Sequence, residues 1–231
     1  MTADLPVKII ELKESVLEDN HKDAQDLRSE LKAQKTCLLN LMSGPGSGKT
    51  TTLLALNKYL RGRLKWGVME ADIDSDVDAR TILAAGIPAV QLHTGGMCHL
   101  DADMTRQGLK ALFESTDEHL DLVVLENIGN LVCPAEFDTG AHKNVMILSV
   151  PEGDDKPLKY PLMFSVCDLV LINKIDTLAY FDFNIEAAKQ RIRRLNPGAE
   201  ILCVSAKTGE GLDAVCDWVR KACSEQMKVR I

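Results

Sequence analysis

Residues 43–50 read SGPGSGKT, and this glycine-rich segment is the most informative stretch of the chain for the fold. It follows a short apolar run at 37–42 and precedes a helical pattern at 50–61. A strand, a glycine-rich turn and a helix in this order form a P-loop, in which backbone N–H groups and the helix N-terminus bind phosphate. Ser43 stands where the common pattern has glycine, and a small residue fits there. The segment therefore predicts a P-loop nucleotide-binding fold.

Within this loop each residue type has an expected task. Lys49 is expected to reach the β- and γ-phosphates, and the Thr50 hydroxyl is expected to bind Mg²⁺. The predicted phosphate-binding residues are Gly44, Gly46, Ser47, Gly48, Lys49, Thr50 and Thr51.

The rest of the chain alternates between short apolar runs and amphipathic segments. Strands are predicted at 37–42, 66–71, 88–92, 120–126, 144–150, 169–172 and 200–204, and helices at 50–61, 78–85, 100–115, 184–195 and 212–223. This alternation predicts an α/β fold with a mainly parallel sheet covered by helices on both faces. Apolar residues at helical spacing over 5–35 predict a helical arm at 1–35, ahead of a nucleotide-binding domain at 36–231.

Composition excludes several protein classes. The chain has 231 residues and carries 27 Lys+Arg against 34 Asp+Glu, a net charge of -7, which argues against a general nucleic-acid binder. No apolar run approaches the roughly 20 residues that span a bilayer, so no membrane association is expected. Residues 1–10 lack the basic start and apolar core of a secretory signal. We therefore expect a cytoplasmic protein with reduced cysteines.

Two segments after predicted strands indicate which base the site selects. Asn173, Lys174 and Asp176 form the sequence NKID, in which the aspartate accepts two N–H bonds from guanine that adenine cannot offer. Ser205, Ala206 and Lys207 follow the next predicted strand and resemble the loop that supports the guanine carbonyl. Together with the P-loop, these six residues predict a site for GTP rather than ATP.

Acidic residues end two of the predicted strands. Asp72 and Glu126 lie where ligands bind in open α/β sheets, so both are candidates to hold Mg²⁺ or orient the attacking water. The predicted catalytic residues are accordingly Lys49, Asp72 and Glu126. The nearby Asp74, Asp76 and Asp78 are interpreted as solvated or helix-capping residues.

Cys98 and His99 are adjacent and lie between glycines and a predicted helix, and Cys133 follows another strand. Thiolate and imidazole ligands suit Zn²⁺ or Ni²⁺, but small buried cysteines with a capping histidine explain the same residues equally well. His142 is a weaker candidate for an extra ligand. The remaining cysteines are expected to pack in the core: Cys37, Cys167, Cys203, Cys216 and Cys223.

Six segments together resemble the HypB family, SIMIBI-class P-loop GTPases that assist nickel insertion into [NiFe]-hydrogenase. They are SGPGSGKT at 43–50, EAD at 70–72, GGMCHLDA at 95–102, ENIGNLVCPA at 126–135, EGDDKPLKYP at 152–161 and NKID at 173–176. The resemblance covers 36–223. It implies a homodimer formed with GTP, with Ni²⁺ or Zn²⁺ held by Cys98, His99 and Cys133 at or near its interface. It also implies two partners, a HypA-type metallochaperone and the hydrogenase large-subunit precursor.

The chain departs from this family in its first 36 residues. They contain no cysteine and only His21, so the tight N-terminal nickel site and the histidine-rich storage segment of some members are not expected. Ala71 stands where glycine is expected before the switch aspartate. Hydrolysis should be slow, because no arginine is placed as a finger in cis. Lys156 is a weak candidate to reach across a dimer.

Three other functions remain compatible with these motifs. A urease-type nickel-insertion GTPase is the nearest, although its typical metal segment is Cys-Pro-His. A P-loop kinase of a small metabolite is disfavoured by Asn173 and Asp176, and a non-enzymatic metal-binding scaffold is disfavoured by Lys49 and Thr50.

Overall fold

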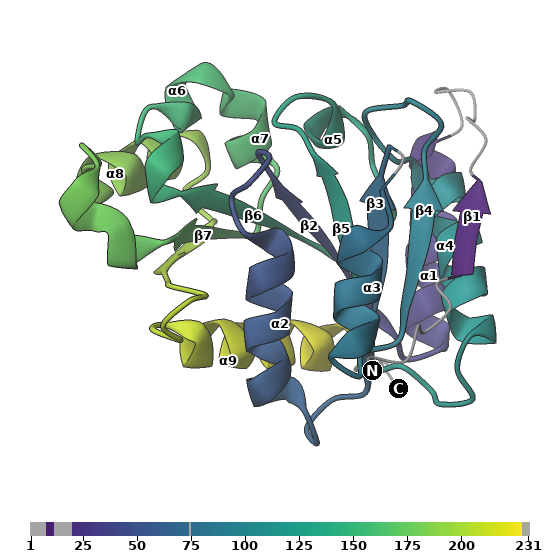
Figure 1. The fold of residues 1–231 in the computed structure, drawn as a ribbon. Helices are drawn as coiled ribbons and strands as arrows, with labels where there is room; N and C mark the ends of the chain where they lie inside the picture. Colours follow the sequence, from purple (N-terminus) through teal and green to yellow (C-terminus); the bar gives the residue numbers. More distant parts are fainter. Residues whose placement is uncertain (1–7, 12–19, 74, 228–231) are drawn as a thin grey trace.

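A computed structural model describes residues 8–11, 20–73 and 75–227. All strands of this part form one parallel eight-stranded sheet in the order β1-β4-β3-β5-β2-β6-β7-β8 (Figure 1). The strands are β1 Lys8–Glu11, β2 Cys37–Ser43, β3 Trp66–Asp72, β4 Ala89–His93, β5 Leu122–Gly129, β6 Lys143–Ser149, β7 Leu169–Asn173 and β8 Glu200–Cys203. The predicted α/β class with a mainly parallel sheet is confirmed.

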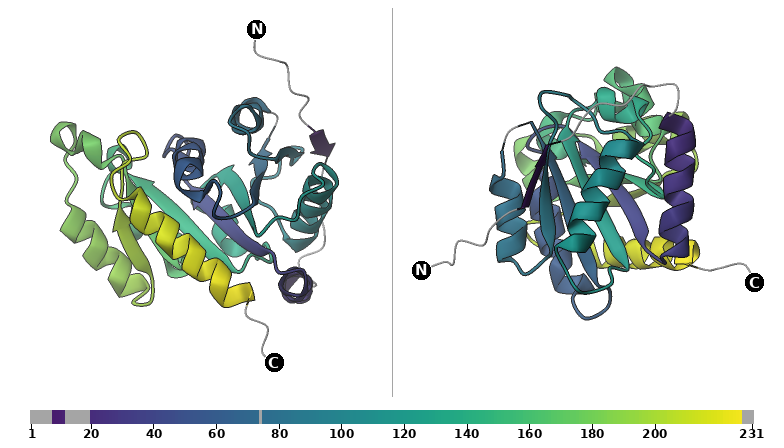
Figure 2. Two further views of the ribbon diagram at one scale, coloured as in Figure 1. Left: turned by 90° about the horizontal axis from the view of Figure 1, so that it is seen from below. Right: turned by 90° about the vertical axis from the view of Figure 1, so that its right-hand side faces the viewer.

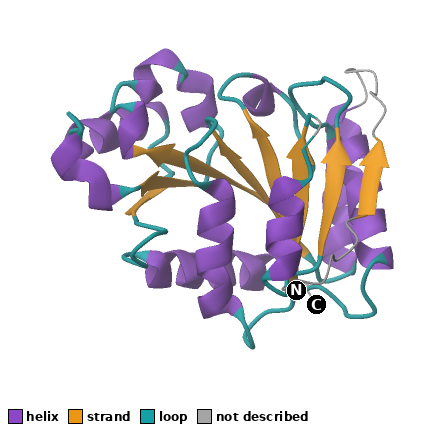
Figure 3. Cartoon of the chain, viewed as in Figure 1, coloured by secondary structure: helices purple, strands orange, loops and turns teal. Residues whose placement is uncertain are grey.

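Helices cover both faces of this sheet (Figure 3). They are α1 Asn20–Ala33, α2 Lys49–Leu60, α3 Val77–Ala84, α4 Ala102–Glu114, α5 Cys133–Glu136, α6 Lys156–Lys159, α7 Pro161–Ser165, α8 Ile185–Leu195 and α9 Leu212–Met227. Short 3₁₀ turns lie at Val150–Glu152 and Ile175–Tyr180. No helix in the described ranges is long and apolar enough to cross a membrane.

Strands β2 to β7 are mainly buried, which explains their near-continuous apolar sequences. In β2, Leu39 and Leu41 pack under α2 and α9, whereas Leu38 and Met42 face the opposite side. That opposite side is covered by α1 and α4 near β4 and by α7 and α8 near β7. Figure 2 shows α3 on one side of the sheet and α4 and α1 on the other. The carboxyl ends of the strands are thus left for the loops that carry the polar motifs.

The predicted helix over 5–35 is wrong at Lys8–Glu11. These residues form strand β1, which pairs in parallel with β4 from Lys8 opposite Val90 to Glu11 opposite His93. The β-branched pair Ile9 and Ile10 suits a strand, and the open edge of β4 supplies backbone partners. Residues 20–33 are helical as expected, while 1–7 and 12–19 lie outside the described residues. The boundary between an arm at 1–35 and a domain at 36–231 stays a prediction.

Candidate functional site

The predicted P-loop connects β2 to α2 at the carboxyl edge of the sheet. Gly46 and Gly48 have φ values of +71° and +99°, a region that favours glycine and lets successive N–H groups turn inwards. At Gly44 a Cβ atom would collide with the carboxylate of Glu152. The Ser47 hydroxyl is buried and has no hydrogen-bond partner in the described part of the chain. A cradle of N–H groups with an unpaired hydroxyl fits the oxygens of a nucleotide phosphate.

The two predicted base-selecting segments meet directly behind this loop. The amide of Asn173 donates to the Ser47 carbonyl at 2.9 Å, and its oxygen accepts the Ala206 N–H at 3.2 Å. Lys174 donates to the Gly46 carbonyl at 2.7 Å and has a φ of +62°, which only a strongly constrained non-glycine residue adopts. Segments far apart in sequence are therefore joined to the P-loop by hydrogen bonds.

Asp176 is held in place by the second base-selecting segment. The Ser205 hydroxyl donates to Asp176 Oδ1 at 2.7 Å and accepts the Thr208 N–H at 3.1 Å. Lys207 is exposed beside it. A carboxylate oriented by a buried serine next to the phosphate loop is the arrangement that guanine recognition requires.

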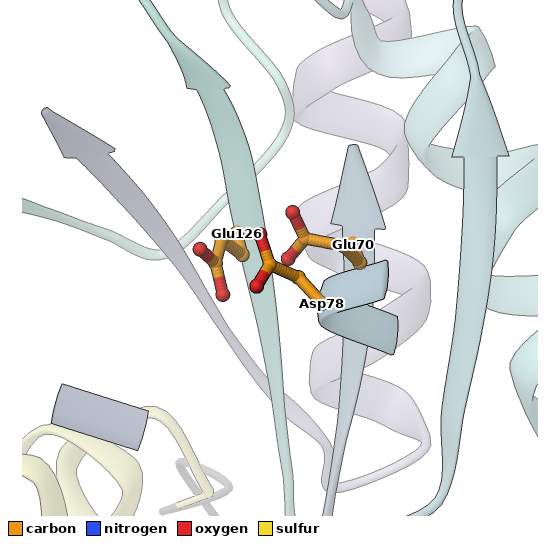
Figure 4. Close-up of side chains that lie close together, drawn as sticks. All are labelled: Glu70, Asp78 and Glu126. Carbon is orange, nitrogen blue, oxygen red and sulfur yellow. The ribbon is translucent and has the colours of Figure 1, made fainter. Parts of the chain in front are cut away.

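Three carboxylates gather within electrostatic reach of the P-loop lysine, Lys49, and Figure 4 shows them side by side. Glu70, Asp78 and Glu126 each have a carboxylate oxygen within 4.8 Å of the others, and the Thr50 hydroxyl donates to Glu126 at 2.9 Å. Glu70 and Glu126 are only 4% and 1% exposed, and each has one oxygen without a hydrogen-bond partner among the described residues. Buried, unpaired carboxylate oxygens beside a threonine hydroxyl fit a divalent cation such as Mg²⁺.

Burial raises the pKa of both glutamates in this group. It raises the pKa of Glu70 well above its usual value, and the negative charge of Glu126 raises it further. The pKa of Glu126 is also raised, mainly by burial, although Lys49 and Thr50 lower it. Two buried carboxylates this close are more stable when they share one proton than when both are negatively charged. A bound cation would remove the repulsion between the two charges.

The acidic group differs from the one predicted. It contains Glu126 as expected, but Asp72 lies outside it and accepts the Ser75 N–H at 2.9 Å at the end of β3. Asp78 is exposed, in agreement with its interpretation as a solvated residue, yet it is a member of the group, and Glu70 was not predicted. The missed signal is a charged residue inside a buried strand: Glu70 pairs in register with Glu126 across β3 and β5.

Two of the three predicted metal ligands meet. The Sγ atoms of Cys98 and Cys133 lie 2.7 Å apart, although 35 residues separate them, and this contact raises the pKa of Cys98. The ring of His99 instead stacks on Phe137, with centroids 3.5 Å apart and planes 14° apart. Within the described ranges, the only three His, Cys, Asp or Glu side chains with ligating atoms all within 4.8 Å are the acidic group. One chain therefore presents a thiol pair rather than a closed three-ligand site.

The role of His142 as an extra ligand stays a prediction: its Nε2 is buried without a hydrogen-bond partner among the described residues, and it joins no group of three ligating side chains there. Its Nδ1 accepts the Leu38 N–H at 3.0 Å, and burial lowers its pKa. The expected packing of the other cysteines agrees with their burial, which is complete except at the partly buried Cys203. The Lys156 ammonium lies 5.6 Å from the ring centroid of Tyr160 in its own chain.

Comparisons with known proteins agree with this geometry. Residues 38–203 match the CobW/HypB/UreG nucleotide-binding domain. The hydrogenase maturation factor HypB of Azotobacter vinelandii is 43% identical over 97% of this chain and 73% of its own length. The hydrogenase/urease maturation factor HypB of Helicobacter hepaticus is 39% identical over 93% of this chain and 88% of its length.

A solved structure gives the same result at the level of the backbone. HypB from Helicobacter pylori in complex with nickel superposes with a TM-score of 0.86 and 35% identity, covering 93% of this chain and 99% of that one. The match extends over almost the whole of both chains. This chain belongs to the HypB family, within the CobW/HypB/UreG group of nucleotide-binding domains.

Proposed function

We propose that this chain is a GTP-hydrolysing nickel metallochaperone that assists nickel insertion during [NiFe]-hydrogenase maturation. The observation that carries the proposal is the position of the thiol pair. Gly129 packs on the P-loop, where an added Cβ would lie 3.2 Å from Pro45 Cα, and Cys133 follows four residues later. A loop that touches the nucleotide site thus leads directly to a soft-metal ligand. The family and its nickel-bound member from Helicobacter pylori support the choice of metal.

Hydrolysis would use the P-loop lysine and the acidic group. Lys49 would bind the β- and γ-phosphate oxygens, while Thr50, Glu126, Glu70 and Asp78 would hold Mg²⁺, which neutralises developing negative charge. A water attacks the γ-phosphorus, the bond to the β–γ bridging oxygen breaks, and GDP and phosphate leave. The reaction should be slow, since no arginine is expected in the site. Asp72 remains a candidate for orienting water.

The nickel would be cargo rather than a resident cofactor. Thiolates suit Ni²⁺ and Zn²⁺, but two sulfurs are too few for either, so a second copy of the chain would complete the site. We therefore propose a homodimer formed with GTP, in which Cys98, His99 and Cys133 contribute from each copy. A HypA-type metallochaperone would supply nickel in the cytoplasm, and the hydrogenase large-subunit precursor would receive it.

A urease-type nickel-insertion role is the second candidate. It is supported by two relatives, from Helicobacter hepaticus and Helicobacter pylori, which are both named hydrogenase/urease maturation factor. The nucleotide and thiol sites would serve either recipient in the same way. Incubation of the loaded protein with each apoenzyme precursor distinguishes them, since only the true recipient gains nickel and activity.

Light scattering of the full chain tests the proposal. The protein is sized with GDP and with a non-hydrolysable GTP analogue, each with and without Ni²⁺. A dimer is expected with the analogue, and Ni²⁺ should stabilise it. Cys133→Ser should keep the nucleotide response and lose the nickel response, whereas the matched control Cys203→Ser should behave as the wild type. A monomer in all four conditions refutes the coupling, and phosphate release from ATP at the GTP rate refutes the assigned nucleotide.

A further inference from the structure

Strand β5 contains a bulge between the acidic group and the thiol pair. Leu41 of β2 lies opposite Glu126, but Ser43 lies opposite Gly129, so β5 accommodates one extra residue at 127–128. A bulge interrupts the hydrogen-bond ladder, leaves backbone groups unpaired and redirects the strand. Such a defect in a central, fully buried strand needs side-chain partners to be stable.

The side chain of Asn127 supplies these partners. It is completely buried, its oxygen accepts the Ile128 N–H at 2.8 Å, and its amide donates to Asn40 at 3.0 Å. Asn40 donates in turn to Asn144 at 3.1 Å, and Asn144 donates to the Val166 carbonyl at 3.1 Å. Each amide of this chain donates to the next, so a single asparagine in the bulge is anchored across β5, β2 and β6.

This anchored bulge lies on the path from nucleotide to thiols. Glu126 precedes it and bonds Thr50 of the P-loop. Gly129 follows it, where an added Cβ would lie 3.5 Å from Lys49 Nζ, and Cys133 comes four residues later. A shift of β5 that begins at Glu126 therefore passes through the bulge before it reaches Gly129 and the Cys98–Cys133 pair.

We propose that Asn127 is a positioning residue that couples the nucleotide site to the thiol pair by holding the β5 bulge rigid. The inference rests on the proposed function, because it requires that nucleotide state alters the thiols. With the anchor in place, a displacement of Glu126 moves Gly129 and the following loop as one body. Without it, the bulge relaxes and absorbs the displacement before it reaches Cys133.

The test measures how nucleotide state changes thiol reactivity. The metal-free full chain is alkylated with N-ethylmaleimide in GDP or in a non-hydrolysable GTP analogue, and the rates at Cys98 and Cys133 are resolved by peptide mass spectrometry. In the wild type the two nucleotides should give rates that differ by about fivefold or more, the lower end of typical coupling. In Asn127→Ala the ratio of the alkylation rates in the two nucleotides should fall below roughly twofold, and the affinity for GDP should stay unchanged.

Two further variants separate coupling from general loosening. Asn196→Ala is the matched control, since it removes another asparagine amide that donates hydrogen bonds, to the carbonyls of Ser165 and Cys167, outside β5 and its bulge. It should keep the wild-type ratio of alkylation rates. Asn40→Ala keeps the hydrogen bond from the Ile128 N–H to Asn127 but removes the acceptor of the Asn127 amide. It therefore tests the coupling if Asn127→Ala fails to fold. Its ratio should also fall.

The outcomes are distinct. A wild-type ratio in Asn127→Ala, or a lowered ratio in Asn196→Ala, overturns the inference and leaves the proposed function standing. A ratio of one in the wild type refutes the coupling in the proposed function and the inference with it.

Discussion

Replacement of Asp176 by asparagine should sharply weaken GTP binding. Asp176 is oriented by the Ser205 hydroxyl at 2.7 Å, and its neighbour Asn173 is bonded to the P-loop at Ser47. The carboxylate is therefore preset to accept two N–H bonds from guanine. Asparagine keeps the shape but turns one acceptor into a donor, which then faces a guanine N–H group.

The magnitude follows from the number of bonds. A hydrogen bond to a charged group contributes about 1.5–3 kcal/mol, so loss of one of the two weakens GTP binding by about that amount, roughly 10- to 150-fold in Kd. Xanthine has a carbonyl where guanine has its amino group, so XTP should recover much of this loss in Asp176→Asn. Ser205→Ala should cost only the orientation of the carboxylate, about 1 kcal/mol or roughly fivefold.

Displacement of a fluorescent GDP analogue measures these affinities with GTP, XTP and ATP as competitors. Asp182→Asn is the matched control, because it makes the same charge change at an exposed site six residues along the chain. The reasoning is refuted if Asp176→Asn binds GTP within roughly threefold of the wild type. It is equally refuted if the affinity for XTP falls as much as the affinity for GTP, which would show that the substitution had disrupted the loop.

Three other changes test further parts of the structure. Cys133→Ala should lower Ni²⁺ affinity by at least roughly tenfold, because loss of a residue that only supports a metal ligand already costs that much. GTP affinity should stay unchanged, and an unchanged Ni²⁺ affinity by titration contradicts the proposed site. Stability should fall as the pH decreases through about 6.5, because burial lowers the pKa of His142 in the folded state and the unfolded chain therefore binds one more proton. His142→Gln should flatten the resulting fall in Tm between about pH 7.5 and 5.5. An unchanged slope of Tm against pH contradicts this role of His142. Asn20→Ala should lower the free energy of unfolding by about 1–3 kcal/mol in urea, since its buried amide ties α1 to the start of α4 and to the loop before β6; a loss below about 0.5 kcal/mol contradicts that role.

The P-loop and the base-selecting segments could be predicted from sequence because their chemistry depends on contiguous residues. A glycine with positive φ, a lysine and a threonine must follow one strand in a set order, and Asn173 to Asp176 must follow another. The helix over 5–35 was wrong at Lys8–Glu11 for the opposite reason. Four residues hold too little periodicity to define a strand, and β1 depends on the free edge of β4.

The acidic group could be predicted only in part. Glu126 ends a recognisable strand, but Glu70 becomes its neighbour through the register of β3 with β5, which no local pattern contains. Asp78 joins them from the first turn of α3, where an acidic residue usually only complements the helix dipole. Its position beside two buried carboxylates is a property of the packing of α3 on β3.

The contact between Cys98 and Cys133 follows from strand order. Cys98 lies in the loop after β4, Cys133 begins α5 at the end of the loop after β5, and β3 lies between these two strands. Neighbouring strands are about 4.8 Å apart, so the two loops start about 10 Å apart and must close over the end of β3 for the sulfurs to meet at 2.7 Å. The strand that they cross carries Glu70 of the acidic group. Under the proposed function, a cation held by the acidic group or a phosphate that moved β5 would therefore act on β3 and β5, the strands beneath the two segments that carry the thiols.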